Sequence, residues 1–523
     1  MALGYALPPE SLAARLRAIS PMLVDTETPG PVLQFAPFMP DRTPLGSQGS
    51  PNVINAIPIP DGYGPVKDFA TVASSALTAR AQGGTAVQDA GGVVRVFAGD
   101  AGKLYLIDVG GTVNDVSKSG GYSTGADEAW EFALDGQTVI ATNYADPVQS
   151  YTLGTSTLFA DHLTSTLKPK MRHMDTIREF LVGGNTDDAT DAVKTARIWW
   201  SGIGDTKDLD PAANTQSDFQ DVRGVGQNQR IVGGVEYGLA FFESAIERMT
   251  YVGAGEVFRF DRIDRKRGTD IPNSVIAHGR RVFFHSPEGF MVNHGAGESE
   301  HIGHGKVDKW FDDQFDTADL SRMSAAIFPL EKSVAWLFPG TGNVDAVPNI
   351  IAFYNYAEDK WGEAEITLQI LIRALSLGFT LEQLDTISTS LDLLPSSLDS
   401  KAWQGGRTIP AGFNSSRVYG TFSGANLQAT IDTGERMINP GYFSRVSGMV
   451  PLVDGGTVTG GIGGRDRQID SVSFDTAQSL NSDGIIPAEN SSRYHRARIV
   501  IAAGGTWNRA QGVQFLSARE GHY

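Results

Sequence analysis

Short apolar segments separated by turn-forming residues make up most of this chain. Apolar and β-branched residues run for about four to eight positions and are then interrupted by Gly, Asn, Asp or Pro, a pattern typical of strands joined by tight turns. The segments Val93–Val109 and Trp130–Tyr144 show the plan most clearly, because each places a Gly-containing turn between two apolar runs. The pattern predicts an all-β protein with few helices.

The strand–turn–strand plan recurs through the middle of the chain. Further copies are predicted in 179–201, 230–244, 280–294 and 325–339, so that turn centres fall near positions 100, 136, 184, 234, 288 and 330. Their spacing of roughly 36 to 54 residues brackets the length of a four-stranded propeller blade, about 40–50 residues. A β-propeller of about six or seven blades is therefore the predicted architecture. An extended array of β-sandwiches is the alternative, which would show shorter and more even strand spacing.

Three segments carry helical patterns. Positions 9–19 place apolar residues on one helical face, and 307–315 is long enough for one or two turns. The clearest pattern begins at Thr380, where Thr380 and Gln383 form a capping-box pair, and Pro395 ends it. A helical insertion near 380–394 is thus expected within the propeller.

Composition changes after Lys401. No lysine follows that position, whereas arginines become frequent, and Arg496–Ala518 has the pattern of two strands around a Gly-Gly turn. The sequence therefore predicts three parts: an N-terminal segment (1–60), a propeller (61–435) and a separate, smaller β domain (436–523). The N-terminal segment is expected to pack on the C-terminal β domain.

Two motifs suggest chemistry at first sight. Gly121–Gly125 matches the G-x-S-x-G pattern of a nucleophile elbow, but its polar, glycine-rich flanks lack the strand and helix that an elbow requires, which favours a loop. His285, His294, His301 and His304 lie close in sequence. They lack the helical spacing and rigid frame of a zinc site, so loop histidines are the favoured interpretation and a metal site the alternative.

Other motifs also favour structural roles. The oxygen-rich run 185–191 lacks the Gly and Glu of an EF-hand, and 503–507 (AGGTW) resembles an Asp-box tail without its aspartate. The alternating charges of 259–270 suggest an ion-paired strand, with a subunit or phosphate contact as the alternative. Six tryptophans are expected in the core rather than in a ligand cage: Trp199, Trp200, Trp310, Trp336, Trp361 and Trp403. We therefore assign no catalytic, cofactor-binding or metal residue and no cofactor, and expect a protein that is not an enzyme.

Composition narrows the possible functions further. The chain has 523 residues, a net charge of −17 and no cysteine, which excludes disulfides, thiolate zinc sites and cysteine nucleophiles. No window approaches the roughly 18 apolar residues that span a bilayer, and the first residues lack a signal-peptide pattern, so we expect a soluble protein made in a cytoplasm. The acidic balance argues against sequence-specific DNA binding.

Several phrases, in their order along the chain, are similar to those of one family. They include 57–69 (IPIPDGYGPVKDF), 130–151 (WEFALDGQTVIATNYADPVQSY), 217–261, 286–295 (SPEGFMVNHG) and 353–361 (FYNYAEDKW). Across about 57–520 the chain resembles the tail nozzle of short-tailed bacteriophages, also called the tail hub, tail tubular protein or packaged-DNA-stabilising protein.

The resemblance implies a structural protein of the virion tail, assembled in the bacterial host cytoplasm. It also implies a β-propeller with a smaller, β-sandwich-like platform domain, here 436–523, on which the N-terminal segment (1–60) would pack. Six copies would form a ring below the portal and adaptor, retain the packaged genome and conduct DNA during ejection. The implied partners are the protein itself, the head-to-tail adaptor or connector, a tail fibre or tailspike, and genomic DNA that passes without sequence-specific binding. The alternatives are a propeller that binds or cleaves glycans and another virion protein such as a fibre adaptor.

Overall fold

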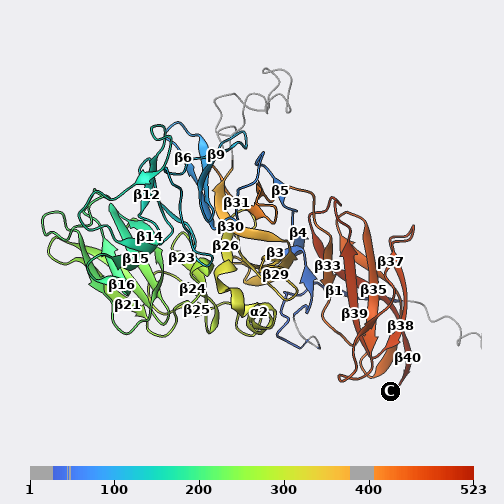
Figure 1. Cartoon of the computed structure of the whole chain (residues 1–523). Helices are drawn as coiled ribbons and strands as arrows, with labels where there is room; N and C mark the ends of the chain where they lie inside the picture. Colours follow the sequence, from blue (N-terminus) through green and yellow to red (C-terminus); the bar gives the residue numbers. More distant parts are fainter. Residues whose placement is uncertain (1–27, 44, 46–48, 377–405, 523) are drawn as a thin grey trace, which may run out of the picture.

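Strands dominate the computed structural model, which describes residues 28–43, 45, 49–376 and 406–522. The described helices are the α-helix α2 (Asp308–Gln314) and two 3-10 helices, η1 (Pro272–Ser274) and η2 (Thr317–Arg322). In Figure 1 the blue to yellow part of the chain forms one lobe of small sheets, and the orange to red C-terminal strands form a second lobe beside it. The prediction of an all-β protein with few helices is confirmed for the described residues.

The first lobe contains seven units of four antiparallel strands. Six are separate sheets, and the remaining one, β26–β29, is part of a larger sheet described below. In chain order the first three units are β6–β9 (Gly83–Gln88, Val94–Gly99, Leu104–Ile107, Val113–Asp115), β10–β13 (Glu131–Asp135, Thr138–Thr142, Gln149–Thr152, Ala160–Asp161) and β14–β17 (Lys170–Ile177, Phe180–Asp188, Ala192–Trp200, Asp218–Asp221). The next two are β18–β21 (Asn228–Val232, Tyr237–Phe242, Ile246–Gly253, Val257–Asp264) and β22–β25 (Ile276–His278, Arg281–Ser286, Gly289–Asn293, Glu300–His301). The last two are β26–β29 (Ser324–Phe328, Ser333–Phe338, Ile350–Asn355, Lys360–Glu365) and β30–β32 (Leu368–Leu375, Thr408–Asn414, Tyr419–Thr421) with β5 (Ala70–Thr71).

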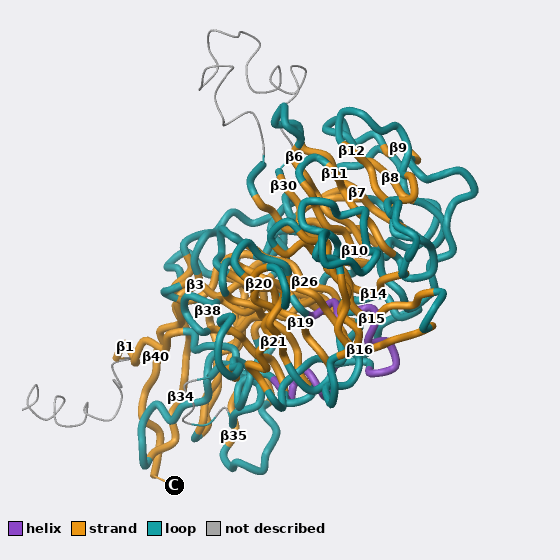
Figure 2. The backbone as a smooth tube through the Cα atoms, turned by 90° about the vertical axis from the view of Figure 1, so that its left-hand side faces the viewer, coloured by secondary structure: helices purple, strands orange, loops and turns teal. Residues whose placement is uncertain are grey.

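Successive units contact one another through their first strands. β6, β10, β14 and β18 follow in sequence, β18 contacts η1 ahead of β22, β22 contacts β26, β26 contacts β30, and β30 contacts β6 again. The seventh unit takes its outermost strand, β5, from the N-terminal side of the chain, where Gly420 pairs with Thr71. Figure 2 shows these small sheets packed side by side in the lobe that faces the viewer.

Tight packing between neighbouring units explains why position 99 is a glycine. A Cβ atom on Gly99 of β7 would lie only 2.3 Å from the ring of Trp130, which precedes β10 in the next unit. The indole nitrogen of Trp130 donates to the carbonyl of Asp100 at 2.8 Å. A larger residue at position 99 would displace this tryptophan from the first unit.

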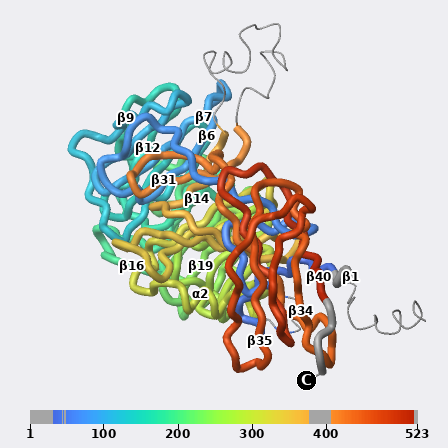
Figure 3. Tube along the Cα trace, turned by 90° about the vertical axis from the view of Figure 1, so that its right-hand side faces the viewer, coloured from blue at the N-terminus to red at the C-terminus, as the bar shows by residue number. Residues whose placement is uncertain are grey.

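The C-terminal lobe is built from strands that are distant in sequence. One sheet has the order β3 (Ala56–Ile59), β4 (Gly62–Pro65), β40 (Ala510–His522), β34 (Tyr442–Val453) and β38 (Ile486–Ser492), and β1 (Thr28–Gln34) also pairs with β40. Figure 3 views this lobe from its own side, with β34, β35 and β40 toward the viewer and β1 at one edge.

A second sheet passes through both lobes. From β26–β29 it continues through β2 (Val53–Ile54), β33 (Ala429–Asp432), β39 (Tyr494–Ile501) and β35 (Val458–Arg465), which pairs with the short strands β36 (Ser473–Phe474) and β37 (Gln478–Ser479). Buried side chains from both lobes form one core, which includes Trp336 and Trp361 in the sixth unit and Ile499 and Phe515 in the C-terminal lobe. The two lobes therefore share both a sheet and a core.

The structure corrects one predicted turn. Position 184 is not a turn centre, because Gly184 lies inside β15 and pairs with His173 of β14 and Ile198 of β16. The hairpin of that unit turns instead at Arg178–Glu179, where Arg178 has a positive φ of 55°. The helix expected at 307–315 is confirmed as α2. The helices expected at 9–19 and 380–394, and Trp403, lie outside the described residues.

Candidate functional site

A cavity of about 390 Å³ lies between the first strands of the seven units. Each unit contributes lining residues from its first strand or the residues just before it. Polar lining residues include Glu131, Asp175, Arg230, Asn273 and Arg373. This cavity is the point at which all seven units of the first lobe meet.

A buried hydrogen-bond network connects three consecutive units at this cavity. The Glu131 carboxylate accepts from Nδ1 of His173 at 2.7 Å, from Nη1 of Arg230 at 2.6 Å and from the Met174 N–H at 3.0 Å. Burial acts to raise the pKa of Glu131, but the charges and hydrogen bonds of Arg230, His173 and Met174 together lower it. The network therefore fixes β10, β14 and β18 relative to one another.

Asp175 faces the same cavity in a different electrostatic environment. Burial raises the pKa of its carboxyl group, although the Gly233 and Thr176 N–H groups donate to it at 2.7 and 2.8 Å. Both of these donors are backbone groups, so Asp175 connects the β18–β19 turn to β14, and no described basic side chain forms an ion pair with it. Its role in the observed geometry is to hold the turn in place.

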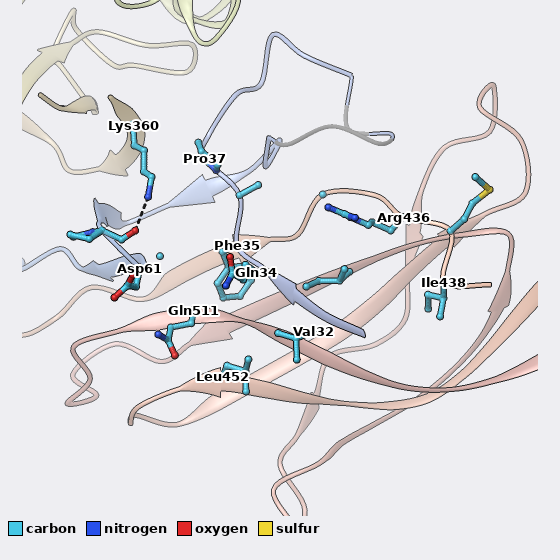
Figure 4. A pocket seen from close by; sticks show the side chains of 16 residues that line it. Val32, Gln34, Phe35, Pro37, Asp61, Lys360, Arg436, Ile438, Leu452 and Gln511 are labelled. Carbon is cyan, nitrogen blue, oxygen red and sulfur yellow. Dashed lines mark hydrogen bonds between the residues drawn. The ribbon is translucent and has the colours of Figure 1, made fainter. Parts of the chain in front are cut away.

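A second and larger cavity, of about 720 Å³, lies between the lobes (Figure 4). One wall is the run from Val32 to Pro37, and the others come from 60–62, 434–438 and the strands β34 and β40. Lys360 closes one end, where its ammonium group donates to the Pro60 carbonyl at 2.9 Å. We call this cavity the interlobe groove.

Two buried carboxylates in the connection between the lobes bind three of the arginines that the sequence concentrates after position 401. Asp432 receives two hydrogen bonds from Arg498, at 2.7 and 2.8 Å. Glu435, which is only 1% exposed, pairs with Arg465 at 2.9 Å and lies 3.8 Å from Arg496. Part of the arginine enrichment noted in the sequence therefore corresponds to side chains of β35 and β39 that hold the connecting segment.

Asn55 links three segments at the shared sheet. Its backbone N–H donates to the Glu363 carbonyl at 2.8 Å, its side-chain oxygen accepts from the Glu365 N–H at 2.8 Å, and its side-chain nitrogen donates to the Gln428 carbonyl at 2.9 Å. Its φ of 57° lies in the left-handed region, which asparagine tolerates better than most residues. One side chain thus connects β29, β2 and the approach to β33.

The structure separates the histidines that lie close in sequence. His285 is buried between Phe290 and Phe311, and burial lowers its pKa to about 4, whereas His301 and His304 are exposed with ring centres 5.7 Å apart. His294 is exposed beside Glu300. Among the described residues, no group of three or more His, Asp or Glu side chains is placed to hold a metal ion.

The serine motif 121–125 is a packed loop between β9 and β10. Tyr122 and Thr124 are buried, and the ring of Tyr122 contacts Trp130 edge-on at 4.9 Å. Ser123 is exposed, and its N–H donates to Asp146 at 2.9 Å. The strand β10 follows this loop where a nucleophile elbow would require a helix.

The remaining motifs occupy strands and turns. Asn185 to Asp188 belong to β15, and Asp188 accepts from the N–H groups of Thr190 and Asp191, so the oxygen-rich run forms a turn. Arg262 in the basic run pairs with the buried Glu247 at 2.7 Å. The turn before β40 contains Gly504, with φ 75°, and is followed by the buried Trp507.

Sequence reasoning missed the Glu131–His173–Arg230 network and the buried carboxylates Asp432 and Glu435. A signal for the network was present, since Glu131 and His173 are polar residues inside otherwise apolar strand patterns. Their pairing could not be predicted, because His173 and Arg230 lie 42 and 99 residues from Glu131 in sequence.

No described helix has the length and apolar character to cross a membrane. Neither a protein-family model nor a curated protein matches this sequence.

Proposed function

We propose that the seven four-stranded units form a closed β-propeller and that the C-terminal lobe is a sandwich-like platform. Three observations support the propeller: the first strands contact one another in a series that returns from β30 to β6, all seven units line one cavity, and β5 completes the last unit from the other end of the chain. A ring of this kind leaves only short outer edges.

We further propose that the protein is a structural component of a bacteriophage tail. In this role six copies form a nozzle below the portal and adaptor, which retains packaged DNA and conducts it during ejection. The proposal rests on the ordered sequence phrases that resemble tail nozzle proteins and on the combination of a propeller-like lobe with a separate β lobe. The copies would assemble in the host cytoplasm and remain in the virion tail.

The observation that carries this proposal is the rigid connection between the lobes. One sheet continues from β29 through β2 and β33 into β39, and one core contains the largest aromatic residues of the sixth unit together with the interior of the C-terminal lobe. A ring under load during genome ejection requires subunits whose two parts do not rotate relative to each other. A continuous sheet and shared core provide that rigidity, because separating the lobes would expose a large apolar area.

The test is the native mass and shape of the purified full-length chain. Native mass spectrometry is expected to show a mass six times 56.0 kDa, and electron microscopy is expected to show a six-fold ring with an open centre. Labelled antibody against this chain should bind the tail tip of assembled particles. A stable trimer would contradict the nozzle and favour a fibre or spike.

A second measurement separates the nozzle from a glycan-active propeller. The purified chain is incubated with bacterial surface polysaccharide, and product formation and binding are measured. The proposal expects neither. Hydrolysis that a single Asp→Asn substitution abolishes would replace the proposed function with an enzymatic one.

A further inference from the structure

The interlobe groove is bordered by a strand edge that no described strand covers. β1 pairs with β40 on one side, and among the residues that the structure describes no strand pairs with its other side. The Phe35 N–H donates to the Gln511 carbonyl at 2.8 Å, which establishes the direction of the backbone groups here. In an antiparallel pair these directions alternate, so the N–H and C=O groups of Val32 and Gln34 point away from β40.

The side chains of this edge alternate in the way that a half-buried strand requires. Leu33 and Phe35 are buried, whereas Val32 is 50% exposed and Gln34 is exposed as well. Preceding positions are unsuited to pairing, because Pro29 and Pro31 have no N–H to donate. The open edge is therefore short, extending from Val32 to Gln34, because the Ala36 carbonyl already accepts from the Tyr63 hydroxyl at 3.0 Å. It lies along the wall of the groove.

The groove has the other properties of a peptide-binding site. Its volume of about 720 Å³ lies within the usual 300–1,000 Å³ of ligand pockets. Apolar side chains from separate segments line it, including Leu452 and Ile438 as well as Met437, which is 40% exposed. An added strand would therefore find both backbone partners and apolar surface for alternate side chains.

Charge indicates the chemistry of the missing strand. Of the charged groups that line the groove, Lys360 donates to the Pro60 carbonyl and Asp61 lies 3.4 Å from Arg509. Arg436 is exposed, and its guanidinium group has no ion pair or hydrogen bond with any other part of the described chain. A cation that no described residue pairs with, at the rim of an open strand edge, favours a carboxylate ligand, because guanidinium and carboxylate groups form paired hydrogen bonds.

We propose that the interlobe groove binds an extended, acidic peptide segment of another protein by strand addition to the Val32–Gln34 edge. The segment places alternate apolar side chains beside Val32 and Met437 and directs a carboxylate to Arg436. This site does not depend on the tail nozzle assignment, since it is built from the strand edge, the groove and the charge of Arg436. Strand addition gives affinity through the backbone and specificity through the alternate side chains.

The test uses the full-length chain and a fluorescein-labelled heptapeptide in which valine and glutamate alternate. Fluorescence anisotropy is expected to show saturable binding of this peptide and at least tenfold weaker binding of the peptide in which lysine replaces glutamate. Two N-methylated versions probe the backbone, with methyl groups on one or the other alternate set of amides. One version should lose binding and the other should keep it, because only one set of amides faces β1.

Substitutions in the protein complete the test. Arg436→Glu should weaken binding of the acidic peptide at least tenfold, and Gln34→Pro should abolish it by removing one outward N–H. Arg265→Glu is the matched control, because Arg265 is an exposed arginine remote from the groove in sequence and absent from its lining, and it should bind as the unmodified protein does.

Three results would overturn the proposal: no binding of the acidic peptide, equal binding of the two N-methylated peptides, or unchanged binding by Arg436→Glu. Sedimentation velocity of the same variants addresses the source of the strand. If Arg436→Glu alters the oligomeric state of the protein without any peptide, the groove is occupied by a second copy of this chain, and the proposal of a separate partner is wrong.

Discussion

The two lobes of this protein are built from the same kind of strand but are connected in opposite ways. In the first lobe every unit except the seventh pairs strands that follow one another in sequence, as in β10–β13, where Glu131 pairs with Thr142 only eleven positions on. In the C-terminal lobe the central strand β40 pairs with β1, so that Gly512 lies opposite Gln34 from the far end of the chain. One lobe is held by local contacts and the other by distant ones.

Because of this difference, the junction of the lobes is the region on which the stability of both lobes depends. Local hairpins close short loops and lose little entropy, whereas the pairings of β1 with β40 and of β33 with β39 form only when distant segments are already close. The buried carboxylates Asp432 and Glu435 and the side chain of Asn55 lie where those pairings meet the sixth unit. We therefore expect substitutions at the junction to affect both lobes and substitutions in a remote unit to affect one.

The largest effect is expected from Trp361→Ala. Trp361 is 1% exposed, stacks on Trp336 with ring centres 5.8 Å apart, and donates to the Ile302 carbonyl at 3.0 Å. Removing it from the shared core should lower the free energy of unfolding by about 3–5 kcal/mol, measured by denaturant titration. Hydrogen exchange should show lost protection in both lobes.

Phe180→Ala provides the matched comparison, because Phe180 is fully buried in a core formed by the units β14–β17 and β18–β21. It should lower the free energy of unfolding by about as much as Trp361→Ala does, but the loss of hydrogen-exchange protection should be confined to the first lobe. If Phe180→Ala exposed the C-terminal lobe as fully as Trp361→Ala, the proposed distinction between the lobes would be wrong.

Glu435→Ala is expected to have the next largest effect, about 3 kcal/mol, since it leaves the largely buried Arg465 and Arg496 without their carboxylate. Thermal and denaturant unfolding measure the loss. The control is Glu489→Ala, which removes an exposed carboxylate paired with Arg445 in the same lobe and should cost less than about 1 kcal/mol. Equal losses for the two variants would show that the buried ion pairs of Glu435 contribute no more to the free energy of unfolding than the exposed pair of Glu489.

Asn55→Ala should reduce stability by about 2 kcal/mol, because it removes two side-chain hydrogen bonds and places alanine at a positive φ. Asn55→Gly separates these causes, since glycine accepts the backbone conformation but cannot make the bonds. Its cost should be roughly half as large. A glycine variant as stable as the original protein would assign the whole effect to backbone strain.

The last prediction concerns the pH dependence of stability. Burial, with a lesser contribution from Glu365, raises the pKa of Glu363 from 4.5 to about 8. The folded state therefore holds a proton that the unfolded state releases, so stability falls as pH rises between about 4.5 and 8. Glu363→Gln should flatten this dependence and stabilise the protein at pH 9 by at least about 1 kcal/mol, measured as a shift in the unfolding midpoint. If the pH dependence of stability were unchanged in Glu363→Gln, Glu363 would not be the group that causes it.

Much of the first lobe was predictable because its information is local. The alternation of apolar residues and the Asp-Gly turn at 135–136 predict the hairpin β10–β11, and the same reasoning holds for the turns near 234, 288 and 330. The prediction failed near 184, where two consecutive glycines lie inside β15. Gly184 is required there because a Cβ atom would lie 2.0 Å from the side chain of Asn228 in the next unit. Such a glycine cannot be distinguished from a turn glycine until its neighbour is known.

The sequence by itself predicted most strands, the hairpins that join them and the burial of most tryptophans, because alternation and turn chemistry act over a few residues. The tertiary structure alone decided which strands cross between the lobes: β5 in the seventh unit, β2 beside β29, and β1 beside β40. It also decided that Asp432 and Glu435 meet the C-terminal arginines and that one edge of β1 faces a groove. Contacts of this kind depend on where distant segments meet in space, and no local periodicity encodes that position.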